Sequence, residues 1–513
     1  MRVVGDISRL NARRFPHKSA LHCAGRSLTF QAADAFANRL ANSLLAQGVR
    51  PGDRVAILAL NALEYIPLFF ATAKCGTLCV PLNFRSSVTE LVYMLDDAKA
   101  ETLFVGPGFA ETALALRQRV PGLSRLIAIG PAAGAAGMMA LDDLIATGNP
   151  DDPGIEIDEA TGVAIIYTSG TTGHPKGAVL SHRSVVDGAC QTALVTGTRH
   201  TDTVLVTVPL FHGGGLMVVS MPHLYLGASL VISEKFDPVA SLESISGAGI
   251  TTLFGVPSQY AALLDVPRVE SYDVSCLRTV WYGAAPMPPE ILQRLLFLWP
   301  QVLFVQCYGQ TETTLIACLG PEEHHAKQGA TGRELSGIEM RVVDDSGADV
   351  PPGTVGEIIV RRDTGMIEYY GKPEQTRDTI RDGWIYTGDL ARIDEERYIT
   401  VVDRKRDVIF SGGENIYPKE IEDLLCQHPD IAHVAVVGTP DPKWGEVPLA
   451  FVVLQPGSAT DAGALEAWCM DRLARYKRPR RWAFVESLPL TATGKVRKNV
   501  LRQWARDRGD GVA

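Results

Sequence analysis

Helical and strand-like stretches alternate along residues 1–150, and this alternation constrains the fold more than any other feature of the chain. Thr29 opens a stretch with apolar residues at helical spacing, and Gly48 closes it. The runs "DRVAILAL", "GTLCVPL" and "AETLFVG" then have the pattern of buried strands. Because alternating helices and strands pack in layers on a mainly parallel sheet, the sequence predicts an α/β fold.

A chain of 513 residues is too long for one ordinary hydrophobic core, so two or more domains are expected. Between residues 330 and 403, short strand-like runs separated by Gly, Pro and Asp predict a small β-rich subdomain. A smaller α/β pattern follows Arg404. We therefore predict a large N-terminal domain of several subdomains, a smaller C-terminal α/β domain, and a very short hinge near residues 403–407.

Charge and hydropathy exclude two classes of protein. The net charge of −9 disfavours nucleic acid as a partner. The most apolar stretch, residues 213–232, is rich in glycine and interrupted by Pro222 and His223. This stretch therefore predicts a buried strand–turn–helix region, and no transmembrane segment is expected.

The cysteines and the N-terminal residues indicate a compartment. Nine cysteines are scattered along the chain without a CxxC pair, which is typical of reduced thiols and not of a disulfide framework or a zinc site. Met1 is followed by "RVVGDISRL", which lacks the apolar run of a signal peptide. We therefore expect a cytoplasmic protein.

The stretch "YTSGTTGHPKG" at residues 167–177 has the composition of a phosphate-binding loop, with four Thr or Ser hydroxyls, three glycines and one lysine. Its spacing does not fit the Walker A pattern, because Gly177 follows Lys176 where that pattern has Ser or Thr. The flanking runs "VAIIY" and "AVLSH" are strand-like, so the loop is predicted to join two strands and to close over a phosphate chain. A plain polar hairpin is the structural alternative.

A second motif suggests a hydrolase, and the rest of the sequence excludes it. "FHGGG" at residues 211–215 contains the HGGG of α/β-hydrolase oxyanion loops. Such an enzyme also needs a nucleophilic serine in a G-x-S-x-G elbow, and no serine of the chain lies in one. The hydrolase hypothesis therefore has no nucleophile.

Five motifs follow one another along the chain: "YTSGTTGHPKG" (167–177), "YGQTE" (308–312), "YTGD" (386–389), "DRKRDVIFSGGENIYPKEIE" (403–422) and "TATGKVRK" (491–498). Together they resemble the adenylate-forming superfamily, and most of all its acyl-CoA synthetase or carboxylic acid–CoA ligase branch. The resemblance implies that a carboxylate reacts with ATP to give acyl-AMP and pyrophosphate, and that CoA then gives acyl-CoA and AMP. ATP, Mg²⁺ and CoA are the implied cofactors.

The resemblance also assigns the residues that bind the nucleotide. Glu312 is expected to help hold Mg²⁺, Tyr308 to stack on adenine, and Asp389 to accept hydrogen bonds from the ribose hydroxyls with Arg404 beside it. The remaining expected ATP or AMP contacts come from the phosphate loop, the "GAA" of residues 283–285 and the "YGQTE" region: Thr168, Ser169, Gly170, Thr171, Thr172, Gly173, Lys176, Gly283, Ala284, Ala285, Gln306, Gly309 and Thr311. Thr168 and Glu312 are also counted among the catalytic residues.

Lys495 is the expected catalytic lysine, because the family's lysine at this position reaches between the carboxylate and the α-phosphate. The implied domains are residues 1–403 for ATP and acid, a hinge at 404–406, and a mobile lid at 407–513. Arg406 is the implied pivot. Read locally, Lys495 is only an exposed lysine in a Thr-Gly-Lys turn.

The acid and CoA sites are assigned more coarsely. The acyl pocket is expected at His212, Gly213, Gly214 and Gly283, with a satisfied core histidine as the alternative for His212. CoA is expected at Gly412, Gly413, Trp444, Tyr476 and Arg478. The basic run "RLARYKRPRRW" (472–482) is read either as a landing site for CoA phosphates or as a solvated helix end, while a third reading, nucleic-acid binding, is disfavoured by the net charge.

The acid is expected to be uncharged, because residues 203–232 contain no Asp, Glu, Lys or Arg. Aromatic, alicyclic and medium-chain acids remain open, as do longer fatty acids. The open alternatives for the reaction are loading of a carrier protein's pantetheine, a luciferase-like oxygenase, and a silent nucleotide-binding module. A homodimer is a further expectation.

Overall fold

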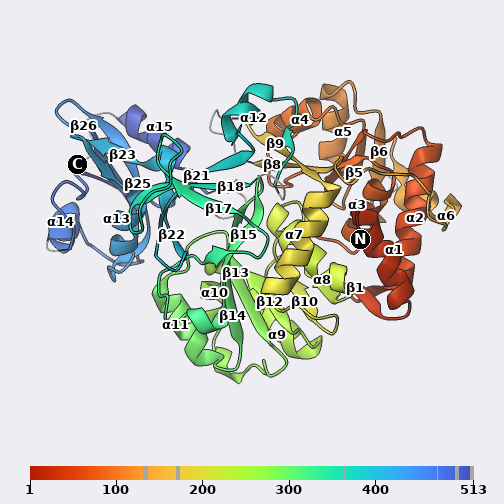
Figure 1. The fold of residues 1–513 in the computed structure, drawn as a ribbon, viewed down its shortest axis with the longest axis horizontal. Coiled ribbons are helices and arrows are strands. Elements are labelled where there is room, and N and C mark those ends of the chain that lie inside the picture. The colour runs from red at the N-terminus through yellow and green to blue at the C-terminus, as the bar shows by residue number, and fades with distance from the viewer. Residues whose placement is uncertain (131–136, 169–173, 362–364, 471, 491–495, 509–513) are drawn as a thin grey trace. The chain divides into compact units, whose positions relative to one another are not determined.

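The computed structural model describes residues 1–130, 137–168, 174–361, 365–470, 472–490 and 496–508 (Figure 1). The chain forms two compact units, Met1–Met340 with Val360–Thr387, and Arg341–Ile359 with Gly388–Ala513. The division into compact units does not locate a hinge, so the expected hinge at residues 404–406 stays a prediction.

The first unit contains a sheet of nine strands in the order β16-β15-β14-β13-β12-β10-β11-β1-β2. The strands from β14 to β1 are parallel to their neighbours, and β15, β16 and β2 are antiparallel. Their bounds are β1 Ser19–Cys23, β2 Arg26–Thr29, β10 Thr203–Val206, β11 Ser229–Ile232, β12 Thr252–Gly255, β13 Thr279–Gly283, β14 Leu303–Gln310, β15 Thr314–Leu319 and β16 Arg333–Glu334. This parallel arrangement confirms the predicted α/β class.

A second sheet of the same unit has the order β19-β9-β8-β4-β3-β5-β6-β7. Its strands from β8 to β7 are parallel, whereas β9 pairs antiparallel with both β8 and β19. The bounds are β3 Arg54–Leu58, β4 Leu78–Pro81, β5 Thr102–Val105, β6 Arg125–Ala128, β7 Met139–Ala140, β8 Gly162–Thr168, β9 Lys176–Ser181 and β19 Glu368–Tyr369. The three strand-like runs of the N-terminal sequence are β3, β4 and β5.

Helices pack against both sheets, and their ends follow from the sequence. The Thr29 side chain accepts from Ala32 N at the start of α2, and Gly48 lies beyond its end with a positive φ of 86°. The helices of this unit are α1 Val4–Arg14, α2 Phe30–Ala46, α3 Tyr65–Lys74, α4 Val88–Asp97, α5 Ala110–Arg119, α6 Leu141–Thr147, α7 His182–Val195, α8 Met221–Leu226, α9 Pro238–Gly247, α10 Pro257–Leu264, α11 Pro289–Leu298 and α12 Pro373–Thr379.

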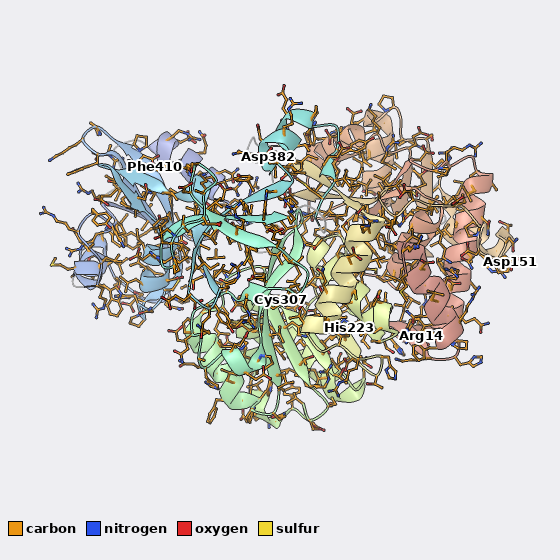
Figure 2. The ribbon with its side chains drawn as sticks, in the orientation of Figure 1. Arg14, Asp151, His223, Cys307, Asp382 and Phe410 are labelled. Atoms are coloured by element: carbon orange, nitrogen blue, oxygen red, sulfur yellow. The ribbon has the colours of Figure 1, made fainter. Side chains whose placement is uncertain are left out.

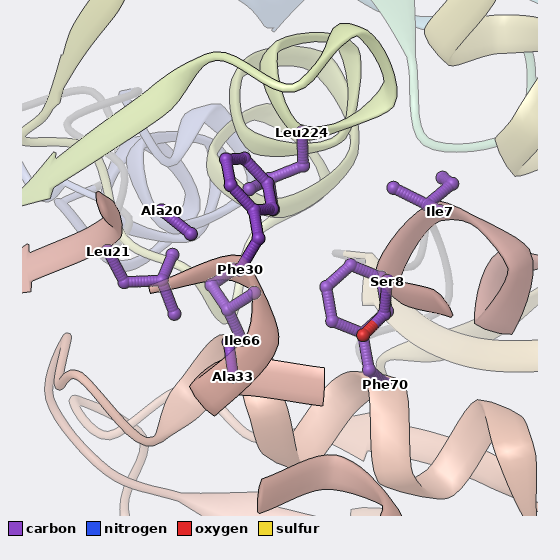
Figure 3. A pocket seen from close by; sticks show the side chains of 9 residues that line it. All are labelled: Ile7, Ser8, Ala20, Leu21, Phe30, Ala33, Ile66, Phe70 and Leu224. Carbon is purple, nitrogen blue, oxygen red and sulfur yellow. The ribbon is translucent and has the colours of Figure 1, made fainter. Parts of the chain in front are cut away.

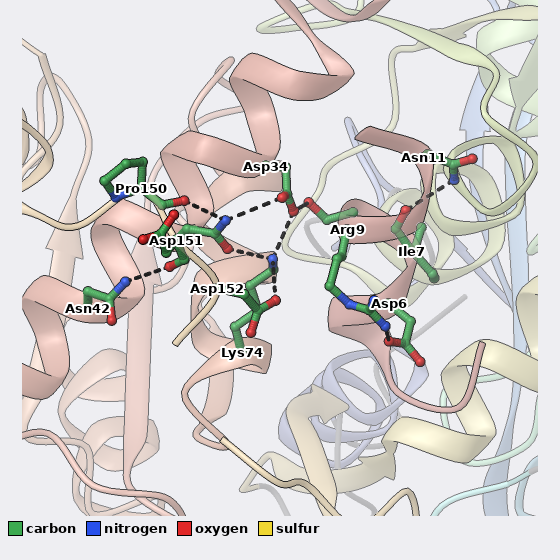
Figure 4. Close-up of polar contacts among 12 residues, drawn as sticks. Asp6, Ile7, Arg9, Asn11, Asp34, Asn42, Lys74, Pro150, Asp151 and Asp152 are labelled. Atoms are coloured by element: carbon green, nitrogen blue, oxygen red, sulfur yellow. Dashed lines mark hydrogen bonds and ion pairs between the residues drawn. The ribbon is translucent and has the colours of Figure 1, made fainter. Parts of the chain in front are cut away.

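A buried ion network joins α2 and α3 (Figure 4). Lys74 Nζ lies 2.8 Å from Asp34 Oδ1, 2.6 Å from Asn38 Oδ1 and 3.3 Å from Asp152 Oδ2. Ser8 Oγ donates to the same Asp34 carboxylate. Because a buried charge is stable only when it is paired and hydrogen-bonded, this network ties α1, α2 and α3 to the segment that precedes β8.

A small cavity lies beside this network, between α1, α2, α3 and α8 (Figure 3). Its lining is apolar apart from Ser8, and includes Phe30, Phe70 and Leu224. It has room for about one water molecule. Since it is far too small for a substrate and offers one polar group, we interpret it as a packing gap.

The order of elements in residues 213–232 differs from the expected strand–turn–helix. A helical segment with π geometry, η2 (Gly214–Ser220), continues into α8, and the strand β11 comes last. Pro222, which has no backbone N–H to donate, is the second residue of α8 and follows directly on the π-helical segment. Gly227 then reverses the chain with a φ of 86°. Among the described helices, none combines the length and apolar character that crossing a membrane requires.

Strands β17 (Met340–Val343), β18 (Val355–Arg361) and β21 (Trp384–Ile393) confirm the short strands expected before residue 403. In the first unit, β20 (Ile380–Arg381) pairs with Trp384 and Ile385 of β21. In the second, β22 (Ile399–Arg404) pairs antiparallel with Asp389–Ile393.

The rest of the second unit is one sheet in the order β24-β23-β26-β25, with β27 beside β26. Helices α13 and α14 cover one hydrophobic cluster of this sheet, which contains Ile421 and Leu465, and α15 covers another, which contains Leu501. The bounds are β23 Ile409–Ser411, β24 Glu414–Ile416, β25 Ile431–Asp441, β26 Gly445–Leu454, β27 Arg481–Phe484, α13 Pro418–Leu425, α14 Ala462–Met470 and α15 Lys498–Arg508. The predicted smaller C-terminal α/β pattern is thus present.

Candidate active site

The phosphate-loop motif connects two antiparallel strands, as the sequence predicts. Thr168 ends β8, Lys176 begins β9, and the two residues face each other across the strand pair. The described residues on both sides of the loop form strands, so neither flank is a helix N-terminus of the kind that anchors phosphates in a Walker A loop. The expected phosphate contacts Ser169, Gly170, Thr171, Thr172 and Gly173 lie outside the described residues.

Residues of α4 hold both ends of this loop. Tyr167 Oη lies 2.8 Å from Asp97 Oδ2, and burial raises the pKa of this phenol, which therefore stays protonated and donates. At the other end, His174 stacks on Tyr93 with ring centroids 4.8 Å apart. Lys372 Nζ completes the group at 2.5 Å from Asp97 Oδ1. Helix α4, which lies outside the five motifs, therefore supports both ends of the loop.

Glu312 lies beside the loop base and shares its contacts. Its Oε1 accepts from Thr168 Oγ1 at 3.2 Å and from Tyr369 Oη at 2.8 Å. Lys176 Nζ lies 4.9 Å from the centre of the Tyr369 ring, within the range of a cation–π contact. Tyr369 therefore links the lysine of the loop to the carboxylate, and Glu312 and Thr168 come together although 144 residues separate them.

The donors at this point fit a magnesium ion held mainly by its nucleotide. Glu312 supplies one hard carboxylate whose Oε2 is distinct from the oxygen used by Thr168 and Tyr369. Among the described residues, no group of three or more His, Cys, Asp or Glu side chains could form a metal site. Mg²⁺ commonly binds through one or two carboxylates together with phosphate oxygens and water, so this donor set suits it.

Close backbone approaches shape the expected adenine region. A Cβ on Gly283 would lie 2.2 Å from the carbonyl oxygen of Cys307, which is labelled in Figure 2, and one on Gly309 would lie 1.9 Å from Thr314 O. Ala284 has a φ of 65°, in the left-handed region. Gln306 and Tyr308 are half-buried on β14, while Ala284 and Ala285 are exposed. The first unit thus gathers the "GAA" and "YGQTE" motifs at the ends of two neighbouring strands.

The expected acyl segment lies against the same motif. A Cβ on Gly213 would lie 3.8 Å from Thr311 Oγ1. His212 Nδ1 accepts from Gly214 N at 3.1 Å. Phe211 meets Phe84 edge to face at 5.3 Å between ring centres. The structure therefore brings the "FHGGG" and "YGQTE" motifs together.

The second unit holds the expected ribose and hinge residues. Arg404 Nε lies 2.6 Å from Asp389 Oδ1, and the Asp389 side chain is 5% exposed. Lys405 pairs with Glu357 at 3.0 Å. Beyond the expected pivot, Arg502 of α15 donates to the carbonyl of Arg406 at 3.2 Å.

The five expected CoA residues have different surroundings. Gly412 lies on Trp444, because a Cβ there would be 2.6 Å from the indole, and Arg480 stands 4.9 Å from the indole ring centre. Arg478 Nε donates to Leu473 O at 2.9 Å. Tyr476 is partly exposed, and Gly413 has a φ of 88°. Lys495 lies outside the described residues.

Sequence reasoning missed Tyr369, Asp97 and Arg480. Tyr369 and Asp97 stand in none of the five motifs, and each contacts a partner far away in the chain. Arg480 is part of the basic run, but nothing local separates it from Arg478. The missed residues would be found only by knowing which strands and helices are neighbours.

The model of the AMP-binding enzyme family matches residues 9–370, and that of the AMP-binding enzyme C-terminal domain matches residues 420–495. The chain is 40% identical over 493 residues to feruloyl-CoA synthase of Amycolatopsis sp, covering 96% of this chain and 97% of the relative. It is 38% identical to indoleacetate–CoA ligase of Aromatoleum aromaticum, covering 95% of each chain. It is also 36% identical to the fatty acid–[acyl-carrier-protein] ligase ScoC of Streptomyces coeruleorubidus, covering 97% of this chain and 95% of the relative.

Solved structures agree with these matches. The anthranilate CoA ligase AuaEII in complex with anthranoyl-AMP superposes with a TM-score of 0.90 at 30% identity, over 98% of this chain and 97% of that one. ATP-bound MatB from Rhodopseudomonas palustris superposes with a TM-score of 0.89 at 32% identity, over 98% and 99% of the two chains.

Proposed function

Because the chain belongs to the AMP-binding enzyme family, we propose that it is an ATP-dependent carboxylic acid–CoA ligase that activates an uncharged aromatic acid. It joins acid and ATP into acyl-AMP with release of pyrophosphate, and then transfers the acyl group to the thiol of CoA with release of AMP. The observation that carries this proposal is the contact of Glu312 with Thr168 at the base of the phosphate loop. It joins two motifs that are distant in the chain.

In the first step, positive charge and hydrogen-bond donors must stabilise the phosphates as the carboxylate attacks. Thr168 and Lys176 lie at the ends of β8 and β9, where they can hold the β- and γ-phosphates. Glu312 would hold Mg²⁺, which when bound neutralises phosphate charge. Thr311 beside Gly213 is suitably placed to contact the α-phosphate close to the acid. Lys495 would supply the charge between carboxylate and α-phosphate.

In the second step, CoA must reach the adenylate, so the C-terminal domain has to turn. Contacts on the two sides of the proposed pivot support this role of Arg406. Lys405, just before it, pairs with Glu357 at 3.0 Å, whereas Asp407, just after it, pairs with Arg502 of α15 at 2.6 Å. A backbone rotation between residues 405 and 407 would break neither ion pair, because Lys405 would stay with Glu357 and Asp407 would stay with Arg502.

CoA would bind in the second unit. Gly412 and Trp444 form a close backbone–indole contact, and Arg480 adds a cation above the indole. A flat aromatic surface next to a cation suits an adenine ring and a phosphate. Gly413, Tyr476 and Arg478 remain the other proposed contacts.

An aromatic acid is proposed because of the relatives and the apolar pocket segment. Ferulate, indoleacetate and anthranilate, which name three of the similar proteins, are all aromatic acids. His212 lies next to Phe211, whose ring contacts Phe84. An aromatic lining of this kind favours a planar ring through edge and face contacts.

Exchange of labelled pyrophosphate into ATP tests the proposal. A panel of aromatic, alicyclic, medium-chain and long-chain acids would be compared with and without CoA. We expect exchange with one or more aromatic acids, and formation of acyl-CoA when CoA is added. Absence of exchange with every acid would contradict the adenylating function, and exchange with fatty acids alone would contradict the aromatic preference.

The resemblance to ScoC favours one second candidate, an enzyme that loads the pantetheine of a carrier protein. The same assay distinguishes it, because thioester would then form on a holo carrier protein and not on CoA. We further propose a cytoplasmic location, since all nine cysteines carry free thiols. Association into a homodimer stays a prediction.

A further inference from the structure

A buried tyrosine and histidine stand next to Gln306, a residue of the expected adenine region. Tyr282 lies on β13 directly opposite Gln306 of β14, and its side chain is 1% exposed. Tyr282 Oη lies 3.0 Å from His324 Nε2 and 3.2 Å from the near atom of the Gln306 amide, Oε1 as placed. His324 Nδ1 lies 2.7 Å from the carbonyl oxygen of Gly320. The four groups form one continuous chain of polar contacts.

The protons in this chain can be placed from its far end. The carbonyl of Gly320 can only accept, so Nδ1 of His324 must carry a proton and donate to it. Burial lowers the pKa of His324 and keeps its ring neutral, so Nε2 has a lone pair and must accept. The Tyr282 hydroxyl, which has one proton, therefore donates to His324.

That assignment determines the orientation of the Gln306 amide. Because the phenol proton is already used, the Gln306 atom that faces Tyr282 Oη has to be a donor. The oxygen and nitrogen of a glutamine amide are distinguished by their hydrogen bonds, and this network places Nε2 toward Tyr282. The amide oxygen then faces away from the phenol and is an acceptor for whatever binds there.

We propose that Tyr282 and His324 are positioning residues that make Gln306 selective for a 6-aminopurine. The 6-amino group of adenine donates, and matches the outward amide oxygen. The 6-oxo group of hypoxanthine or guanine accepts, and would meet that oxygen with a second acceptor. The proposal rests on the proposed function only for the location of the purine at Gln306. It gives His324, a buried histidine 18 residues beyond Gln306 and outside the five motifs, a role in nucleotide recognition.

Equilibrium binding of two nucleotides to the full-length protein tests the proposed orientation of the Gln306 amide, and it does not require knowledge of the acid. ATP and inosine triphosphate, each with Mg²⁺, would be titrated calorimetrically. We expect wild-type protein to bind ATP at least about tenfold more tightly, since an unmatched buried acceptor weakens binding by about this factor. Tyr282→Phe removes the link, so the ratio of the two dissociation constants should fall to within about threefold of unity.

Tyr260→Phe is the matched control. Tyr260 is also fully buried in the same hydrophobic cluster, and its hydroxyl donates to Trp281 O at 2.7 Å without touching Gln306. This variant also loses a buried hydroxyl bond, so a merely structural effect would appear in both variants. The preference for ATP should persist in Tyr260→Phe alone.

If Tyr282→Phe does not fold, the variant His324→Leu provides the same test. Without the imidazole acceptor, the phenol can turn its proton toward Gln306, and the amide then presents its nitrogen outward. The preference should shift toward inosine triphosphate, a result that lost stability cannot produce. An unchanged ratio in the folded variants, or equal binding of both nucleotides by wild-type protein, would overturn the inference. Failure of wild-type protein to bind ATP at all would overturn the proposed function with it.

Discussion

Single side chains at the loop base decide how the carboxylate proposed to hold Mg²⁺ is oriented. Glu312 is a half-buried carboxylate with two hydroxyl donors on one oxygen, from Thr168 and Tyr369. Hydrogen bonds to an ionised group are the stronger kind, and they set the direction in which the second oxygen points. We therefore expect Tyr369 to matter for function through its hydrogen bond to Glu312.

Tyr369→Phe removes one donor and keeps the ring on which Lys176 rests. We expect the concentration of Mg²⁺ needed for half-maximal pyrophosphate exchange to rise about tenfold, the effect of losing a hydrogen bond to a charged group. Tyr370→Phe is the control, since that neighbouring side chain packs on a hydrophobic cluster. Equal effects of the two variants would contradict the positioning role.

Lys495→Ala tests the residue proposed for the chemistry of the first step. We expect adenylate formation to fall by about 10²–10³ or more, because one donor aimed at the developing charge is lost. Thioester formation from a supplied acyl-adenylate should be largely spared, which makes the second half-reaction the internal control. Pyrophosphate exchange near the normal rate would show that another group supplies this charge.

At the scale of elements, close strand contacts determine where the motifs lie. The antiparallel pair β14–β15 shifts register between Tyr308 and Gly309, so the strand changes direction just before Glu312. Glycine is required at this point, because a Cβ on Gly309 would lie 1.9 Å from Thr314 O. The turn that carries "YGQTE" thus depends on one missing methyl group.

Gly309→Ala should therefore destabilise the protein by about 1–3 kcal/mol, the cost of forcing extra atoms into a packed site. Pyrophosphate exchange should fall as well, because Tyr308 and Glu312 move with the strand. Gly247→Ala is the control at the end of α9, where a Cβ would meet nothing within 4 Å. Thermal unfolding and exchange would both be measured, and two equally mild variants would contradict the steric requirement.

At the scale of the whole molecule, the two half-reactions need two arrangements of the proposed domains. Arg406→Pro fixes φ at the proposed pivot and removes its backbone N–H. We expect pyrophosphate exchange to persist and acyl transfer to CoA to stall, with each half-reaction assayed separately. Equal loss of both would refute the hinge role.

Two buried histidines make the stability of the molecule depend on pH. Burial lowers the pKa of His182 and His223 to about 4, well below the ordinary value of about 6.5. Between these values the unfolded chain binds protons that the folded chain does not, so stability falls as pH decreases from about 6.5 toward 4. At pH 5 each histidine should lower the free energy of unfolding by about 2 kcal/mol relative to neutral pH.

We therefore expect the apparent melting temperature to drop steadily over this range, and His223→Gln to reduce the slope. His17→Gln, at an exposed position, is the control. A melting temperature that is constant from pH 7 to pH 5 would contradict the assignment of neutral buried rings.

The sequence by itself determined the family, the α/β class, the strand–loop–strand form of "YTSGTTGHPKG" and most of the proposed nucleotide residues. These are properties of short continuous stretches, because hydropathy period, turn residues and motif spacing act within a few residues. It misjudged the order of elements in residues 213–232, since a short apolar run rich in glycine fits helix and strand alike. The helical segment η2 is set by packing against its neighbours.

Only the tertiary structure decided which distant side chains serve these motifs. Glu312 and Tyr369 are 57 residues apart, and Tyr282 and His324 are 42 apart, and neither pair follows a local pattern. Strand order places such residues side by side, and strand order results from burying many apolar faces at once. A contact of this kind is therefore a property of the assembled sheet and not of any stretch of chain.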